Sequence, residues 1–77
     1  MEGTINKLKP EGPYGFIYSQ NNQSYFFHRE DYIGFWEDLV KDFRTNPIIK
    51  VVFDDAKTEK GLRARNVRRL DFPNQAV

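Results

Sequence analysis

Hydrophobic and polar residues alternate along two short segments in the first third of the chain. Residues 14–19 and 24–28 each place every second side chain on the same face, which is the pattern of a half-buried strand. Asn21 and Asn22 lie between the two segments, in a polar linker of hairpin length. The pattern predicts a β-hairpin over residues 14–28.

Three further segments have the character of strands. Residues 3–9 contain Ile5 and Leu8, whose spacing breaks strict alternation and predicts a bulge or bend. Residues 47–54 are rich in β-branched side chains and are bounded by turn-forming residues. Residues 61–70 form the last predicted strand.

One segment has a helical pattern instead. Within residues 29–44, apolar side chains recur at steps of three and four. They are Tyr32, Ile33, Trp36, Leu39, Val40 and Phe43. Acidic residues begin the segment and basic residues end it, in keeping with the helix dipole. Asn46 ends the helix because the residue before a proline avoids helical angles, whereas Gly34 weakens its first turn.

The predicted order is three strands, one helix and two strands. This order is typical of an all-β protein with a five-stranded antiparallel OB-type barrel and a helical insertion between strands 3 and 4. The apolar face of the helix is expected to plug the barrel. Since 77 residues are too few for two domains, we expect one domain over residues 1–72 and a frayed tail at 73–77.

The hairpin has two aromatic faces. One face carries Tyr14, Phe16, Tyr18, Phe26 and His28. The opposite face, which can supply the core, carries Ile17, Tyr25 and Phe27. If the first face is open to water, its rings form a surface on which unpaired bases stack, each contributing roughly 1–3 kcal/mol. The competing interpretation is core packing, because large rings usually point inward.

The net charge is only +1, from 12 basic and 11 acidic residues, which argues against binding duplex DNA mainly through its phosphates. The charges are nevertheless segregated, with acidic residues concentrated in 30–42. The basic residues of 60–69 are Lys60, Arg63, Arg65, Arg68 and Arg69. If this segment lies beside Lys7 and Lys9, a local basic strip results, in which at least one arginine contacts phosphate. The alternative is an ordinary solvated strand face.

Several functional classes find no support. The chain has no cysteine and one histidine, so we expect no disulfide, no metal site and no cofactor. Nothing marks a nucleophile that could act with His28, and we expect no enzymatic activity. No apolar run reaches the roughly 18–20 residues of a membrane span, and the first residues do not resemble a secretion signal. We therefore expect a cytoplasmic protein without a membrane partner.

Three motifs resemble those of cold-shock domains. Residues 3–17, which contain the run Gly12-Pro13-Tyr14-Gly15-Phe16-Ile17, resemble the first strand and first ribonucleoprotein-type motif of that family. The run Tyr25-Phe26-Phe27-His28 resembles its second motif, and residues 60–67 resemble its closing strand. The similarity covers residues 3–28 and 50–70. It implies an OB-type barrel that binds single-stranded DNA or RNA by stacking bases on exposed rings.

The resemblance also implies a set of contact residues. Lys60 falls where the family often has a basic contact, whereas Lys7 replaces a usual tryptophan and Arg29 replaces a usual phenylalanine. An arginine can still stack its guanidinium plane on a base. The expected nucleic-acid-binding residues are Lys7, Lys9, Tyr14, Phe16, Phe26, His28, Arg29 and Lys60. The rings would stack bases, and the cations would follow the backbone of the strand.

A second interpretation keeps the barrel but assigns it a protein partner. The segment 29–46 is longer and more helical than the usual connection in cold-shock domains. Phe35 and Trp36 could restore an aromatic ring near the stacking surface or, with their acidic neighbours, dock a protein through residues 30–44. Both interpretations are compatible with a monomer or weak dimer. An RNA-chaperone-like role, in which unpaired strands are trapped, belongs to the first.

Overall fold

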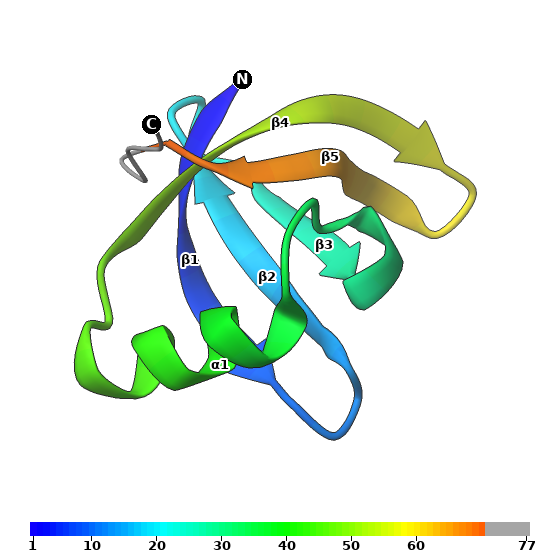
Figure 1. Cartoon of the computed structure of the whole chain (residues 1–77). Helices are drawn as coiled ribbons and strands as arrows, with labels where there is room; N and C mark the ends of the chain where they lie inside the picture. The colour runs from blue at the N-terminus through cyan, green and yellow to red at the C-terminus, as the bar shows by residue number, and fades with distance from the viewer. Residues whose placement is uncertain (71–77) are drawn as a thin grey trace.

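Five strands close into a barrel, and a helical segment joins the third strand to the fourth (Figure 1). The computed structural model describes residues 1–70. The strands are β1 (Glu2–Lys9), β2 (Tyr14–Ser19), β3 (Ser24–His28), β4 (Ile49–Thr58) and β5 (Gly61–Arg69). The helical elements are the 3-10 turn η1 (Arg29–Asp31) and the helix α1 (Trp36–Thr45). The OB-type barrel with an insertion after the third strand is thereby confirmed, while the predicted tail at 73–77 lies outside the described residues.

The order of strands around the barrel is β1-β2-β3-β5-β4, and β4 returns to β1. Within residues 1–70, four strand pairs are antiparallel and the pair of β3 with β5 is parallel. At the parallel junction, Phe26 lies opposite Arg63. The chain reaches this junction through the long β4–β5 hairpin, which extends to one side of the barrel in Figure 1. This hairpin brings the basic residues of β5 to the edge of β3.

Two bulges bend the strands. In β1, Asn6 is the extra residue between Ile5 and Lys7, which confirms the bulge predicted for the first strand. In β5, the bulge includes Asn66, whose φ of 53° lies in the left-handed region and whose Nδ2 donates to Asp54 Oδ2 at 2.8 Å. A bulge increases the local twist of a strand. Both bulges therefore help a sheet of five strands to close on itself.

The core lies inside the barrel and beneath α1. It consists of Ile5, Ile17, Tyr25, Phe27, Trp36, Leu39, Ile49, Val51, Phe53, Ala64 and Val67. The face of the β2–β3 hairpin that carries Ile17, Tyr25 and Phe27 is the buried one, as its sequence pattern allows. Because side chains alternate along a strand, the other aromatic face of this hairpin is directed away from the core.

The helical segment differs from its prediction, because a continuous helix over 29–44 does not form. Gly34 has a φ of +139°, which a helix excludes, and it separates η1 from α1. Before this break, Tyr32 forms a bridge with Val67, and the Ile33 N–H donates to the Val67 carbonyl at 2.8 Å. The open edge of β5 thus satisfies backbone groups that a helix would otherwise pair within itself.

The helix that remains plugs one end of the barrel. Trp36 and Leu39 are buried, and Val40 and Phe43 pack against the core. Ile33 was expected on the same face but is 52% exposed, because it belongs to the extended linker and not to α1. The helix ends before Asn46-Pro47, as predicted.

The fourth strand is also longer than predicted. The acidic pair Asp54-Asp55 was expected to end it, but β4 continues to Thr58. Asp54 lies opposite Arg65, and Asp55 lies opposite Ala64, so the pairing with β5 supports residues that are individually poor strand formers. The predicted boundary was wrong for this reason.

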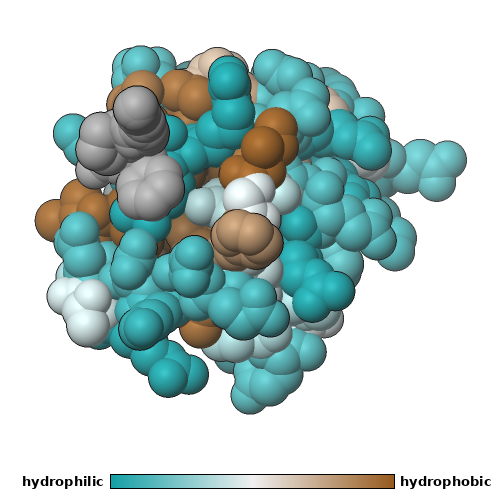
Figure 2. Space-filling model, in the orientation of Figure 1, coloured by the Kyte–Doolittle hydropathy of each residue, from teal (hydrophilic) through white to brown (hydrophobic). Residues whose placement is uncertain are grey.

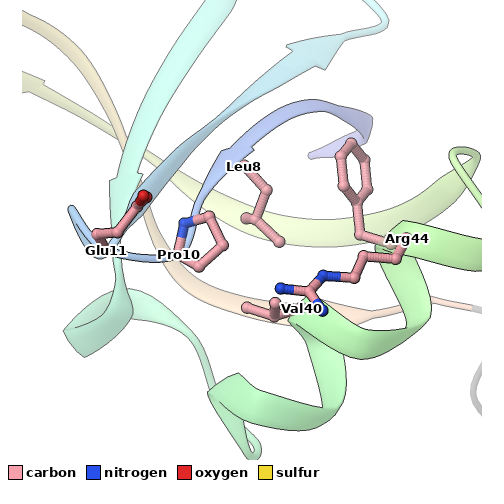
Figure 3. Close-up of a pocket in the computed structure, with 6 residues that line it drawn as sticks. Leu8, Pro10, Glu11, Val40 and Arg44 are labelled. Carbon is pink, nitrogen blue, oxygen red and sulfur yellow. The ribbon is translucent and has the colours of Figure 1, made fainter.

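A hollow lies between α1 and the turn that follows β1. Its volume is about 440 Å³, and Figure 3 shows Leu8 and Val40 on either side of it. Its lining residues are Leu8, Pro10, Glu11, Val40, Phe43 and Arg44. Figure 3 shows the Glu11 carboxylate at one side of the hollow, while the Arg44 side chain reaches inward and places its guanidinium beside Val40.

Candidate nucleic-acid interface

Three rings cluster on the outer face of β2 and β3. Phe16 lies directly opposite Phe26, and Tyr14 lies directly opposite His28. The Tyr14 and Phe26 rings are stacked, with centroids 5.5 Å apart and an interplanar angle of 29°. Phe16 meets both rings edge to face, with centroid distances of 5.9 Å to Tyr14 and 5.8 Å to Phe26. We call Tyr14, Phe16, Phe26 and His28 the platform; all four are half-buried.

Two lysines of β1 border the platform. Lys7 lies opposite Phe16, and Lys9 lies opposite Tyr14, and both lysines are exposed. Residues directly opposite each other in an antiparallel pair project from the same face of the sheet. The bulge at Asn6 matters here, because a one-residue slip in register would direct Lys7 to the other face.

Arg63 borders the platform on its other side. It lies opposite Phe26 at the parallel junction of β3 and β5, and its Cζ is 5.9 Å from the centroid of the Phe26 ring. Lys7, Phe16, Phe26 and Arg63 therefore form one row across four strands. The sequence pattern grouped Arg63 with three other arginines of 60–69 and did not assign it to the contact residues.

A buried carboxylate holds Arg63 in place. Asp31 is 6% exposed, and its Oδ2 accepts hydrogen bonds from Arg63 Nε at 2.9 Å and from the His28 N–H at 3.0 Å. Its Oδ1 lies 3.8 Å from Nε of Arg65. Sequence reasoning placed Asp31 only among the acidic residues of a helix. The signal that could have identified it is the three-residue spacing from His28, which is that of a capping box.

The only histidine of the chain has a defined ring orientation. His28 Nδ1 accepts a hydrogen bond from the Glu30 N–H at 3.2 Å, which caps η1. This leaves Nε2 as the ring nitrogen that can donate to a ligand. In the described residues, no group of three or more His, Cys, Asp or Glu side chains could hold a metal ion.

The β4–β5 turn adds Lys60. A hollow of about 450 Å³ separates this turn from the platform. It is lined by Phe16, Phe26, Thr58, Lys60, Gly61, Leu62 and Arg63. Thr58 Oγ1 accepts from the Lys60 N–H at 3.2 Å and donates to the Gly61 carbonyl at 3.0 Å, which defines the turn. Gly61, with a φ of +128°, provides the left-handed conformation that the turn requires.

Arg29 lies at the far end of the platform. It follows His28 and is exposed, and its N–H donates to the Pro13 carbonyl at 3.1 Å. All eight contact residues expected from the sequence therefore lie on the outer face of β1–β3, at its end or at the adjoining hairpin turn. Tyr18, the remaining ring of this face, is exposed, and its hydroxyl donates to Asn22 Oδ1 at 3.2 Å.

The two aromatic residues at the start of α1, Phe35 and Trp36, do not extend the platform. Trp36 is 7% exposed and packs edge to face on the core ring of Phe27, with centroids 6.0 Å apart. The expectation that Trp36 could restore a stacking ring was therefore wrong, because its ring belongs to the apolar face of α1 that packs on the core. Phe35 is 77% exposed, but it lies in the linker that precedes α1 and lines, with Arg68 and Arg69, a hollow that contains no platform residue.

Comparisons with known proteins do not identify the family of this chain. No protein-family model matches the chain, and no curated protein matches it. No helix within residues 1–70 has both the length and the apolar character needed to cross a bilayer. The geometry of the platform is therefore the basis for an inference about function.

Proposed function

We propose that this protein binds single-stranded RNA or DNA on the platform, as a diverged relative of the cold-shock domains. The observation that carries the proposal is the direct pairing of Phe16 with Phe26 on the outer face of the barrel. Neither ring belongs to the core, to which β2 and β3 contribute Ile17, Tyr25 and Phe27 from their other face. Packing alone therefore does not account for aromatic residues at both outer positions.

The distribution of charge supports the same function. Cations lie on both sides of the rings, with Lys7 and Lys9 on β1 and Arg63 and Lys60 on or beside β5. A single strand that stacks its bases on the rings would place its phosphates near these cations. Duplex DNA would be a poor ligand, because its base faces are already stacked on each other.

The motifs that resemble cold-shock domains support the assignment independently of the geometry. Their stacking positions correspond to the four platform residues, and all of these lie together on one surface. The role would be to trap unpaired strands in the cytoplasm, and melting of weak RNA structure would follow from such trapping. No catalytic step and no cofactor belong to this proposal.

The test is an NMR titration of the backbone amides with a short oligothymidine, its RNA counterpart and a duplex of the same length. We expect saturable shifts confined to residues 7–9, 14–18, 25–29 and 60–63 with both single strands. The duplex should cause no such shifts. The absence of shifts with either single strand would contradict the proposal.

A double variant and a matched control sharpen the test. Phe16→Ala with Phe26→Ala should abolish strand binding while the barrel stays folded, since both rings lie outside the core. Phe35→Ala removes a ring of the same kind from a hollow that contains no platform residue and should leave strand binding unchanged. Equal losses in the double variant and the control would contradict a role for the platform.

A protein-interaction module remains the second candidate, because one surface away from the platform is apolar. Phe35 is 77% exposed and Ile33 is 52% exposed. Figure 2 shows apolar side chains near the centre of the face that carries the linker before α1, surrounded by hydrophilic ones. In this case the platform double variant would leave partner binding intact, whereas Phe35→Ala would weaken it.

A further inference from the structure

The hollow between the platform and the β4–β5 turn is lined by both aromatic and cationic side chains. Phe16 and Phe26 provide aromatic surface, while Lys60 and Arg63 provide cationic donors. Its volume of about 450 Å³ exceeds that of one nucleobase, so a base lying on the rings could place its polar edge toward these cations. The hollow is therefore suited to reading a base edge and not only to stacking a ring.

The orientation of Arg63 is restricted by two contacts. Its Nε donates to Asp31 Oδ2 at 2.9 Å, and its Cζ lies 5.9 Å from the centroid of the Phe26 ring. Because Nε is engaged by Asp31, the two Nη groups are the part of the guanidinium fork that can donate to a ligand. The buried carboxylate of Asp31 therefore holds the Nε edge of the Arg63 guanidinium and orients its two Nη groups.

Among the side chains that line the hollow, Lys60 and Arg63 carry charged donors, and only Thr58 carries an acceptor. Lysine and arginine side chains donate hydrogen bonds and accept none. The hydroxyl of Thr58 already accepts from the Lys60 N–H and donates to the Gly61 carbonyl. A base that presents an amino group here would face two cations without an acceptor, whereas a base that presents a carbonyl oxygen would be matched.

We propose that this hollow selects keto bases over amino bases, with Arg63 as the specificity-determining residue and Asp31 as its positioning residue. The proposal rests on the proposed function and names the class of strand that the platform prefers. Guanine, which presents O6 and N7 on one edge, fits the two-donor fork, and uracil or thymine presents O4. Adenine and cytosine place an exocyclic amino group at the corresponding position and are disfavoured.

The experiment compares strands that differ only in this group. Heptamers of uridine and of cytidine are titrated at neutral pH, followed by uridine heptamers in which the central positions carry inosine or adenosine. The keto strand of each pair should bind about fivefold or more tightly than its amino counterpart. Arg63→Gln should bring both ratios close to one while cytidine binding is retained, because the platform rings are unchanged.

Matched variants separate this role from a general effect of charge. Arg68→Gln makes the same change at an exposed position of β5 whose side chain lines other hollows, and it should preserve the selectivity. Asp31→Asn should reduce the selectivity more than it reduces cytidine binding, because the fork is misdirected but not removed.

The outcomes distinguish the two proposals. If none of the strands binds, the proposed function fails and this inference fails with it. If uridine and cytidine strands bind equally tightly, the inference alone is overturned and the stacking platform stands. A preference for uridine that persists in Arg63→Gln would overturn the assignment to Arg63.

Discussion

Asp31 and Arg63 join the two sides of the parallel junction that closes the barrel. Asp31 Oδ2 lies 2.9 Å from Arg63 Nε, and this ion pair links the turn after β3 to β5. Arg63 is also the residue of β5 that lies opposite Phe26. The same oxygen accepts the His28 N–H. One carboxylate therefore stabilises the fold and orders two groups at the edge of the platform.

Removal of this carboxylate should destabilise the protein. Asp31→Ala leaves the His28 N–H and the Arg63 guanidinium without their shared acceptor, and we expect a loss of about 1–3 kcal/mol in the free energy of unfolding. Urea denaturation followed by circular dichroism measures the loss. Asp55→Ala, at an exposed position of β4, is the control and should change stability by less than about 0.5 kcal/mol. Equal effects of the two substitutions would contradict the role of Asp31.

The position of Lys7 allows a gain of binding to be predicted. Because Lys7 lies directly opposite Phe16, Lys7→Trp should add a ring to the platform and tighten strand binding by roughly 1–3 kcal/mol. Lys7→Ala should instead weaken binding and reduce the slope of log K against log salt by about 0.7. Fluorescence anisotropy of a labelled strand at several salt concentrations measures both. A tryptophan variant that binds no more tightly than the alanine variant would exclude this position from the interface.

The helix α1 should contribute to the stability of the fold and not to strand binding. Leu39 is fully buried in α1, so Leu39→Ala should cost about 2–5 kcal/mol of the free energy of unfolding. Ile48→Ala, at a position that is 62% exposed, should cost far less. Thermal denaturation compares the two variants. Strand affinity, measured where both are folded, should match that of the parent protein; a selective loss in Leu39→Ala would mean that α1 shapes the interface.

Tyr32 should make the protein sensitive to alkali. Burial raises the pKa of its phenol above the ordinary value of 10.0, an effect that Arg69 opposes and Asp42 and Asp38 reinforce. The folded state therefore holds this proton more tightly than the unfolded chain, so the contribution is complete below pH 10 and is lost as the pH rises above it. Tyr32→Phe should flatten the decline in stability above pH 10, as measured by urea midpoints. An unchanged decline would assign it to other groups.

Much of the fold was predictable because it depends on local patterns. Alternation in 14–28 identified both faces of the hairpin, and the spacing of Ile5 and Leu8 identified the bulge in β1. Pro47 marked the end of α1. Each of these signals acts between near neighbours in the chain, where steric and packing constraints can be read directly.

The errors have a common cause in contacts between distant segments. The start of the predicted helix is diverted into an extended linker because the edge of β5 pairs with Tyr32 and Ile33. The acidic end of β4 continues as a strand because β5 lies opposite it. In both places a long-range backbone partner outweighs local propensity.

The side chains that could form the core and the rings that could share a surface were evident from the sequence, because the two-residue period of a strand assigns each residue to a face. The border of that surface on the side of β5 depends on the tertiary structure. The parallel pairing of β3 with β5 brings Arg63 beside Phe26, and the turn after β3 brings Asp31 beneath Arg63. These residues are far apart in the chain, and they meet because closure of the barrel joins strands that no local pattern pairs.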